Sequence, residues 1–156
     1  MDPAIVFQQQ CTQDRDDDTL YLPTWTVDVW LRLFAHARPV SVATGDVVIR
    51  HGEHDRALYF VTRGALEVAS SASRHDTLGT LSREHPGSVI GEISLFDGLP
   101  RTASVWAVKP TELLRLDRQA LDEFAREEPA HALELLFGLG RVLALRLRRG
   151  EARLNR

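Results

Sequence analysis

Residues 45–68, with the sequence GDVVIRHGEHDRALYFVTRGALEV, decide the fold class of this chain. They contain the runs 46–50 and 57–62, which are rich in β-branched and aromatic residues, and most of a third short run at 65–69, and glycine-containing turns separate the runs. Short runs at this spacing, broken by turn residues, are typical of strands in an antiparallel sandwich or barrel. The stretch therefore predicts consecutive strands rather than alternating strands and helices.

The same pattern of short runs separated by turn residues continues on both sides of this stretch. Further runs that read as strands lie at 40–42, 77–82, 88–90, 102–108 and 112–116. The runs are too short and the breaks too frequent for a parallel sheet, because parallel strands need long crossover connections. An antiparallel β-roll of the double-stranded jelly-roll type is expected.

Helical patterns flank the β-rich segment. Thr26 is a suitable N-cap, and the apolar side chains that follow lie on one helix face until Pro39, at Val27, Trp30, Leu31 and Phe34. Asp117 can cap a short helix, and Pro129 can occupy the first turn of a second one. The predicted fold is mainly β, with an N-terminal helix and two C-terminal helices.

The composition is that of an ordinary globular domain. Of the 156 residues, 44% are hydrophobic and 26% are charged, which fits one domain with short appendages. Residues 1–22 are polar with an acidic run and predict a flexible N-terminal arm, whereas residues 150–156 predict a basic tail. The domain itself is expected at residues 23–149.

Charge and cysteine content narrow the class of protein further. The net charge of −3 gives no general attraction to nucleic acid or to a membrane surface. Cys11 is the single cysteine, so an internal disulfide is excluded. Neither a long apolar run nor the pattern of a signal peptide is present, and we expect a cytoplasmic protein.

The segment after residue 90 interrupts the strand pattern and has the chemistry of an anion site. Gly91 allows close approach of a ligand to the backbone, and the short helix expected after it exposes free N–H groups. Arg101 can donate two hydrogen bonds to a phosphate, with hydroxyls at Ser94 and Thr102 nearby in sequence. Glu92 would repel a phosphate, so it would accept from a sugar hydroxyl. An ordinary turn with a weak Glu92–Arg101 surface ion pair is equally compatible with these residues.

Two motifs resemble the cyclic nucleotide-binding domain of bacterial catabolite-activator-type regulators, cyclic-nucleotide-gated channels and cyclic-nucleotide-dependent kinases. The first is the run 45–52 leading into 57–68. The second is Ile90-Gly91-Glu92-Ile93-Ser94-Leu95, then five residues, then Arg101-Thr102-Ala103-Ser104-Val105, which is similar to the phosphate-binding cassette of that family. The resemblance extends from about residue 27 to residue 149. We call residues 91–103 the cassette.

This resemblance implies roles for individual residues. Glu92 would accept a hydrogen bond from the ribose 2′-hydroxyl, and Arg101 would neutralise the cyclic phosphate. The expected ligand-binding set is Gly91, Glu92, Ile93, Ser94, Arg101, Thr102 and Ala103. An apolar wall for sugar and base would come from Val61, Val89, Leu95 and Val105.

The identity of the ligand is open at this point. Thr102 is similar to the threonine of cyclic-GMP-preferring members, yet bacterial cyclic-AMP receptors also accept serine or threonine there. Cyclic AMP is slightly favoured, cyclic GMP is possible, and a cyclic-di-GMP-responsive or ligand-free interaction module is the alternative. The chain departs from the family at Asp55, where a small residue is common, and at Arg56, where an acid is common.

The last helical segment carries an apolar seam. Its leucines lie at spacings of three and four, at Leu136, Leu139, Leu143 and Leu147. Such a seam favours a homodimer through the 129–149 helix, although packing of the helix on its own β-roll gives a similar pattern. No helix-turn-helix follows, so nucleic-acid binding is not expected, and the output is expected in an unidentified domain or partner protein.

Enzyme and metal sites are not predicted. His51, Glu53 and His54 are close in sequence, but their spacing on a turn is unspecific for a metal. A cupin-type histidine cluster and a recognisable nucleophile elbow are both missing. We therefore expect no catalytic residues, no metal and no cofactor beyond the nucleotide ligand.

Overall fold

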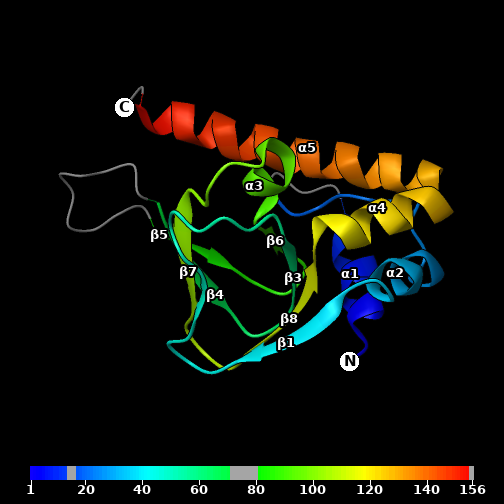
Figure 1. The fold of residues 1–156 in the computed structure, drawn as a ribbon, viewed down its shortest axis with the longest axis horizontal. Coiled ribbons are helices and arrows are strands. Elements are labelled where there is room, and N and C mark those ends of the chain that lie inside the picture. Colours follow the sequence, from blue (N-terminus) through cyan, green and yellow to red (C-terminus); the bar gives the residue numbers. More distant parts are fainter. Residues whose placement is uncertain (14–16, 71–80, 155–156) are drawn as a thin grey trace.

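The structure, a computed structural model, describes residues 1–13, 17–70 and 81–154 (Figure 1). Eight strands in this part of the chain form two antiparallel sheets. The first sheet has the order β1 (Arg38–Val42), β8 (Thr111–Leu116), β3 (Leu58–Arg63) and β6 (Val89–Ile90). The second has the order β2 (Val47–Ile49), β7 (Ala103–Ala107), β4 (Leu66–Ser70) and β5 (Leu81–Glu84). The predicted β-roll with flanking helices is confirmed.

The helices begin where their capping residues indicate. Helix α2 (Val27–Phe34) follows Thr26, α4 (Arg118–Glu127) follows Asp117, and α5 (Pro129–Leu154) begins at its proline. The side chain of Asp117 accepts a 2.8 Å hydrogen bond from the N–H of Ala120, as an N-cap should. Helix α5 continues to Leu154 and includes most of the segment predicted as a basic tail.

One strand is displaced from its expected position. The run 77–82 was expected to form it, but residues 77–80 lie outside the described part of the chain. Strand β5 instead occupies Leu81–Glu84 and pairs with β4 in the register Leu66–Glu84 to Ala69–Leu81.

The N-terminal segment differs from the flexible arm that its polar composition suggests. Residues Pro3–Cys11 form helix α1, whose start is capped by the Asp2 side chain 2.8 Å from the N–H of Ala4. Phe7 is completely buried, and its ring centroid lies 5.1–5.5 Å from those of Trp30, Phe34 and Phe60. The aromatic contacts, rather than the average polarity of the segment, decide its structure.

Two apolar clusters stabilise the domain. One lies among the helices and the first sheet, where it includes Trp25, Trp30, Phe60 and Phe124. The other includes Tyr59 and Leu66, and joins residues of both sheets. Figure 1 shows α5 lying along one side of the roll, where it passes helix α3 (Glu92–Asp97).

The cassette connects the two sheets. It begins directly after β6 of the first sheet, forms α3, and ends where β7 of the second sheet begins. Its place in the fold is therefore between the ends of two strands and beside α5 (Figure 1). Among the described helices, none is both long and apolar enough to cross a membrane.

Candidate functional site

The backbone at Gly91 starts the cassette. Gly91 has φ +88°, in the left-handed region that glycine adopts without strain, and it precedes the first turn of α3. A Cβ added there would lie 2.6 Å from the carbonyl oxygen of Ala57 and 2.7 Å from Nη1 of Arg101. The glycine is therefore required both for the backbone conformation and for the close approach of Arg101.

Arg101 is buried and held by backbone carbonyls. Its side chain is 3% exposed, Nη1 donates to the carbonyl oxygen of Gly91 at 3.0 Å, and Nη2 donates to that of Ala57 at 2.7 Å. Its own N–H donates to the carbonyl of Glu53 and its carbonyl accepts from Gly52, both at 2.8 Å. The fold therefore fixes this cation through contacts of its own.

Asp55 supplies the negative charge that balances this buried cation. Its carboxylate lies 3.5 Å from Nη2 of Arg101 and 3.0 Å from Nη2 of Arg115, and it accepts from the N–H of Ala57 at 3.0 Å. Although burial raises the pKa of Asp55, the Ala57 bond and the two arginines outweigh burial and lower it. The departure from the family pattern at Asp55 thus places a carboxylate beside Arg101.

Arg56, the second departure, supports the end of α3. Its Nε donates to the carbonyl of Ser94 at 3.2 Å, and its Nη2 donates to that of Leu95 at 2.6 Å. These carbonyls lie in the last turns of α3, where a cation is favourable because the helix dipole is negative. The loop residues Asp55 and Arg56 therefore position Arg101 and α3, respectively.

Glu92 is also buried and paired, by a residue that sequence reasoning missed. Its side chain is 5% exposed, and Oε1 accepts from Nη1 of Arg146 on α5 at 2.6 Å. Arg146 also donates to Asp18 at 2.7 Å and to the carbonyl of Val89 at 2.9 Å, and it lies 3.6 Å from Glu84. The sequence signal was only the series of arginines toward the end of the last helical segment and a segment rich in aspartate near the start of the chain.

The pKa values of these groups follow their surroundings. Burial would lower the pKa of Arg146, but Glu92, Glu84 and Asp18 raise it. Burial raises the pKa of Glu84, only partly opposed by Arg146. Burial raises the pKa of Asp18, but the hydrogen bond from Arg146 and the charges of Arg146 and Arg149 outweigh burial, so the pKa is lowered. Arg146 is therefore a cation at all ordinary pH values, with several carboxylates around it.

The remaining expected ligand residues are distributed along the cassette. Ser94 is 2% exposed, whereas Ile93 is 39% exposed on the outer side of α3. Thr102 is exposed and Ala103 half-buried, at the start of β7. The structure brings Gly91, Glu92 and Arg101 to the same end of α3.

The residues expected to form an apolar wall are packed inside the domain. Each is at most 3% exposed. Val89 and Leu95 belong to the cluster beside the helices, whereas Val61 and Val105 belong to the cluster between the sheets. Their role toward a nucleotide stays a prediction.

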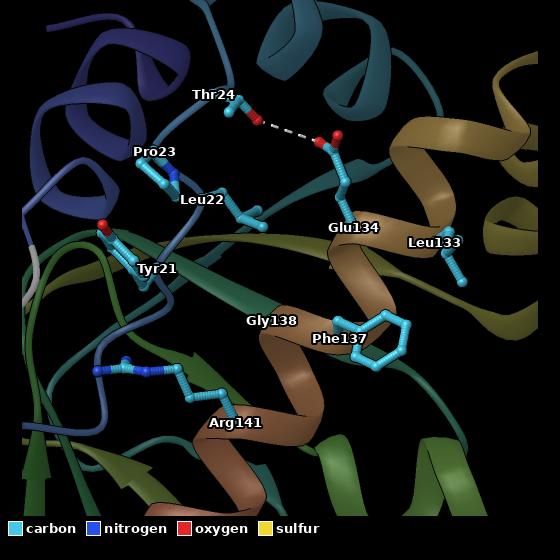
Figure 2. Close-up of a pocket in the computed structure, with 9 residues that line it drawn as sticks. All are labelled: Tyr21, Leu22, Pro23, Thr24, Leu133, Glu134, Phe137, Gly138 and Arg141. Atoms are coloured by element: carbon cyan, nitrogen blue, oxygen red, sulfur yellow. Dashed lines mark hydrogen bonds between the residues drawn. The ribbon is translucent and has the colours of Figure 1, made fainter.

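A hollow of about 350 Å³ lies elsewhere, between the N-terminal segment and α5. Figure 2 shows its lining, which includes Tyr21, Phe137 and Arg141, and none of the cassette residues. Glu134 on its edge accepts from Thr24 at 3.3 Å and from the indole of Trp25 at 2.8 Å. The hollow lies where residues 21–24 meet α5, and the cassette residues do not line it.

Histidine, cysteine and acidic side chains do not assemble into a metal site in the described residues, where no group of three or more is found. Cys11 is buried among the apolar side chains of the core.

The chain has relatives among known proteins. The family profile described as cyclic nucleotide-binding domain matches residues 39–128. The CRP-like cAMP-activated global transcriptional regulator of Mycobacterium tuberculosis is 32% identical over 114 residues, which are 72% of this chain and 48% of that protein. The chain thus spans about half the length of this curated relative.

Solved structures agree with the fold. The catabolite activator protein of Thermus thermophilus superposes with a TM-score of 0.71 at 26% identity, covering 85% of this chain and 60% of the other. A cyclic nucleotide-binding domain from Methylobacillus flagellatus gives a TM-score of 0.79 over 96% of this chain and 81% of its own, and at 20% identity it supports the fold alone.

Proposed function

The chain belongs to the cyclic nucleotide-binding domain family, and on this premise we propose that it is a regulatory module that binds a cyclic mononucleotide through the cassette. The observation that carries the proposal is the meeting of opposite charges at one end of α3. Arg101 donates to the carbonyl of Gly91, and Glu92 is the next residue. A cyclic nucleotide offers an anionic phosphate and a ribose hydroxyl, which match this cation and this acceptor.

The proposed roles follow from the chemistry of each group. Arg101 pairs with the phosphate oxygens, because its planar guanidinium can donate two parallel bonds. Glu92 accepts from the ribose 2′-hydroxyl. The amides of Ile93, Ser94 and Thr102–Ala103 complete the phosphate contacts, and Val61, Val89, Leu95 and Val105 pack near sugar and base.

The proposed ligand is cyclic AMP in preference to cyclic GMP. The bacterial relative is described as cAMP-activated, and this description supports the choice. Thr102 keeps cyclic GMP open, since a threonine directly before β7 offers a hydroxyl to a base amino group. The protein has no catalysis of its own in this proposal, and it acts in the cytoplasm.

Calorimetric titration with cyclic AMP, cyclic GMP, cyclic di-GMP and 5′-AMP tests the proposal. We expect heat of binding with a cyclic mononucleotide and a weaker response to 5′-AMP. Arg101→Lys keeps the charge but loses the planar fork, and should weaken binding at least tenfold. Arg118→Lys is the matched control, because Arg118 is half exposed on α4 and pairs with Asp122 at the surface. Titration without heat for every cyclic nucleotide contradicts the proposal.

We also propose that α5 transmits the signal and forms a homodimer, with the output in an unidentified domain or partner. A heptad-spaced stripe of exposed or half-buried apolar and small residues supports a homodimer, at Leu133, Phe137, Gly140, Ala144 and Leu147. Leu139, which the leucine spacing assigned to the seam, is fully buried in the core of its own domain. The ligand-free alternative is that this dimer is the whole function.

Light scattering separates these possibilities. Phe137 is 74% exposed, so Phe137→Glu should yield a folded monomer if the stripe is the interface. Leu31→Glu on α2, where the side chain is 45% exposed, is the control for an apolar-to-acidic change elsewhere. A dimer that persists in Phe137→Glu contradicts this interface, and a dimer indifferent to every nucleotide favours the ligand-free alternative.

A further inference from the structure

Arg146 joins three carboxylates that come from distant parts of the chain. Nε binds Asp18 at 2.7 Å, Nη1 binds Glu92 at 2.6 Å, and Nη2 lies 3.6 Å from Glu84. We call Asp18, Glu84 and Glu92 the carboxylate cluster. Its members belong to the N-terminal segment, to β5 and to α3, so a single side chain of α5 connects all three.

This contact covers the atom that the proposed function requires. Glu92 is 5% exposed while Arg146 lies on it, and Arg146 itself is 24% exposed. A ribose hydroxyl can reach the carboxylate only if the guanidinium moves. The arginine bond to Glu92 has opposite charges on both partners, whereas a ribose hydroxyl is neutral, so the exchange gives up an ion pair and has a cost for the ligand.

We propose that Arg146 sets the affinity of the nucleotide site by competing with the ribose 2′-hydroxyl for Glu92, and that Asp18 strengthens this competition by holding Arg146 in place. The inference rests on the proposed function, because it assigns the ribose to Glu92. It goes beyond that function by making a side chain of α5 and one of the N-terminal segment determinants of affinity.

The N-terminal segment is well placed to hold Arg146. Leu20 and Leu22 are buried, and Arg141 of α5 lies 5.4 Å from the ring centroid of Tyr21. These contacts fix residues 18–22 against α5, so Asp18 meets Arg146 with little further loss of freedom. Asp18 also accepts a 3.2 Å hydrogen bond from Arg149.

The exchange links the ligand to the position of α5. When the ribose takes Glu92, α5 loses its strongest polar contact with the cassette, while the contact of Arg146 with Asp18 can remain. The ligand then favours arrangements of α5 in which Arg146 lies away from the cassette, which is a population shift by differential contacts.

The test measures the preference of the protein for the 2′-hydroxyl. Wild type and Arg146→Gln are titrated with cyclic AMP and with 2′-deoxy cyclic AMP, and the ratio of the two dissociation constants is compared. In Arg146→Gln the hydroxyl no longer competes, so the preference for cyclic AMP should rise about tenfold, which corresponds to about 1.4 kcal/mol. A general loosening of the fold would change binding of both ligands alike and leave the ratio unchanged.

Three further variants sharpen the result. Asp18→Asn should raise the same ratio by a smaller factor, about threefold, since it weakens the hold on Arg146 without removing it. Arg149→Gln removes a neighbouring cation that also binds Asp18, and should leave the ratio within about twofold. Arg146→Lys keeps the positive charge but loses the branched fork, and it replaces Arg146→Gln should that variant fail to fold.

The outcomes distinguish failure of the competition at Glu92 from failure of the proposed function. A ratio unchanged in Arg146→Gln and Arg146→Lys, or weaker cyclic AMP binding in both, overturns the competition and assigns Arg146 to the ligand or to the fold. Failure of wild type and all variants to bind any cyclic nucleotide overturns the proposed function, and the competition with it.

Discussion

Replacing Arg101 should destabilise the protein even when no nucleotide is present. The side chain is 3% exposed, and it satisfies the carbonyl oxygens of Gly91 and Ala57 at 3.0 and 2.7 Å. Arg101→Gln removes the charge and shortens the side chain, so at least one buried carbonyl loses its donor. Asp55 also loses one of its two cationic neighbours.

The size of the effect can be worked out from these contacts. A buried acceptor left without a partner costs about 1–3 kcal/mol. Breaking a buried ion pair costs about 3–5 kcal/mol, but Asp55 is one-third exposed and keeps Arg115, so only a fraction of this applies. We expect Arg101→Gln to lower the free energy of unfolding by about 2–4 kcal/mol. In a domain of this size, that corresponds to a fall in Tm of roughly 5–15 °C.

Urea unfolding without ligand, followed by the fluorescence of the buried Trp25 and Trp30, measures the loss directly. Arg118→Gln is the control, because this half-exposed arginine pairs with Asp122 on the surface and should change stability by less than about 0.5 kcal/mol. If Arg101→Gln unfolds at the same urea concentration as Arg118→Gln, the buried arginine is not part of the framework of the fold. A binding defect in any Arg101 variant must be judged against this stability loss.

The remaining predictions test the backbone, the charge balance and the N-terminal helix. Gly91→Ala should cost about 1–3 kcal/mol and weaken nucleotide binding, because φ +88° is strained for alanine and its Cβ would meet the Ala57 carbonyl; wild-type affinity in this variant would contradict the geometry. The pKa of Asp55 is held below its usual 3.8, so ionised Asp55 stabilises the fold above that value and this contribution is lost as pH falls through the lowered pKa. Asp55→Asn should therefore be less stable than wild type at neutral pH, and the difference should shrink as pH falls below 3.8, as measured by urea unfolding at several pH values; parallel curves for the two proteins would rule this out. Phe7→Ala should cost about 3–5 kcal/mol in the same assay, since the ring is fully buried among aromatic neighbours; a free arm would tolerate the change.

Much of the fold could be predicted because its signals are local. Short apolar runs between glycine turns predicted the strands, and Thr26, Asp117 and Pro129 predicted where three helices begin. Helix α1 escaped prediction although Asp2 and Pro3 form a start signal and Ala4, Phe7 and Cys11 lie on one face. The segment was predicted to be flexible because its residues are mostly polar on average. The three apolar side chains belong to the core because Phe7 packs against the aromatic cluster.

The leucines of α5 are a second case in which the sequence pattern did not determine the tertiary contacts. Leu136, Leu139, Leu143 and Leu147 have similar spacings, and the sequence offers no means to tell which face meets the domain. The structure buries Leu139 completely and leaves Leu147 65% exposed. The exposed stripe therefore shares Leu147 with the predicted seam but otherwise runs through other residues.

Glu92 and Arg101 of the cassette show which features are local and which depend on the fold. The sequence by itself determined the strand pattern, the helix starts and the motif from Gly91 to Ala103, because each depends on residues close together in the chain. Only the tertiary structure decided that Arg101 is held by Asp55, that Glu92 is held by Arg146, and that Asp18 holds Arg146 in turn. Glu92 and Arg146 are 54 positions apart, and Asp18 and Arg146 are 128 apart. Pairing over such separations depends on how sheets and helices pack, and no local pattern of residue types encodes it.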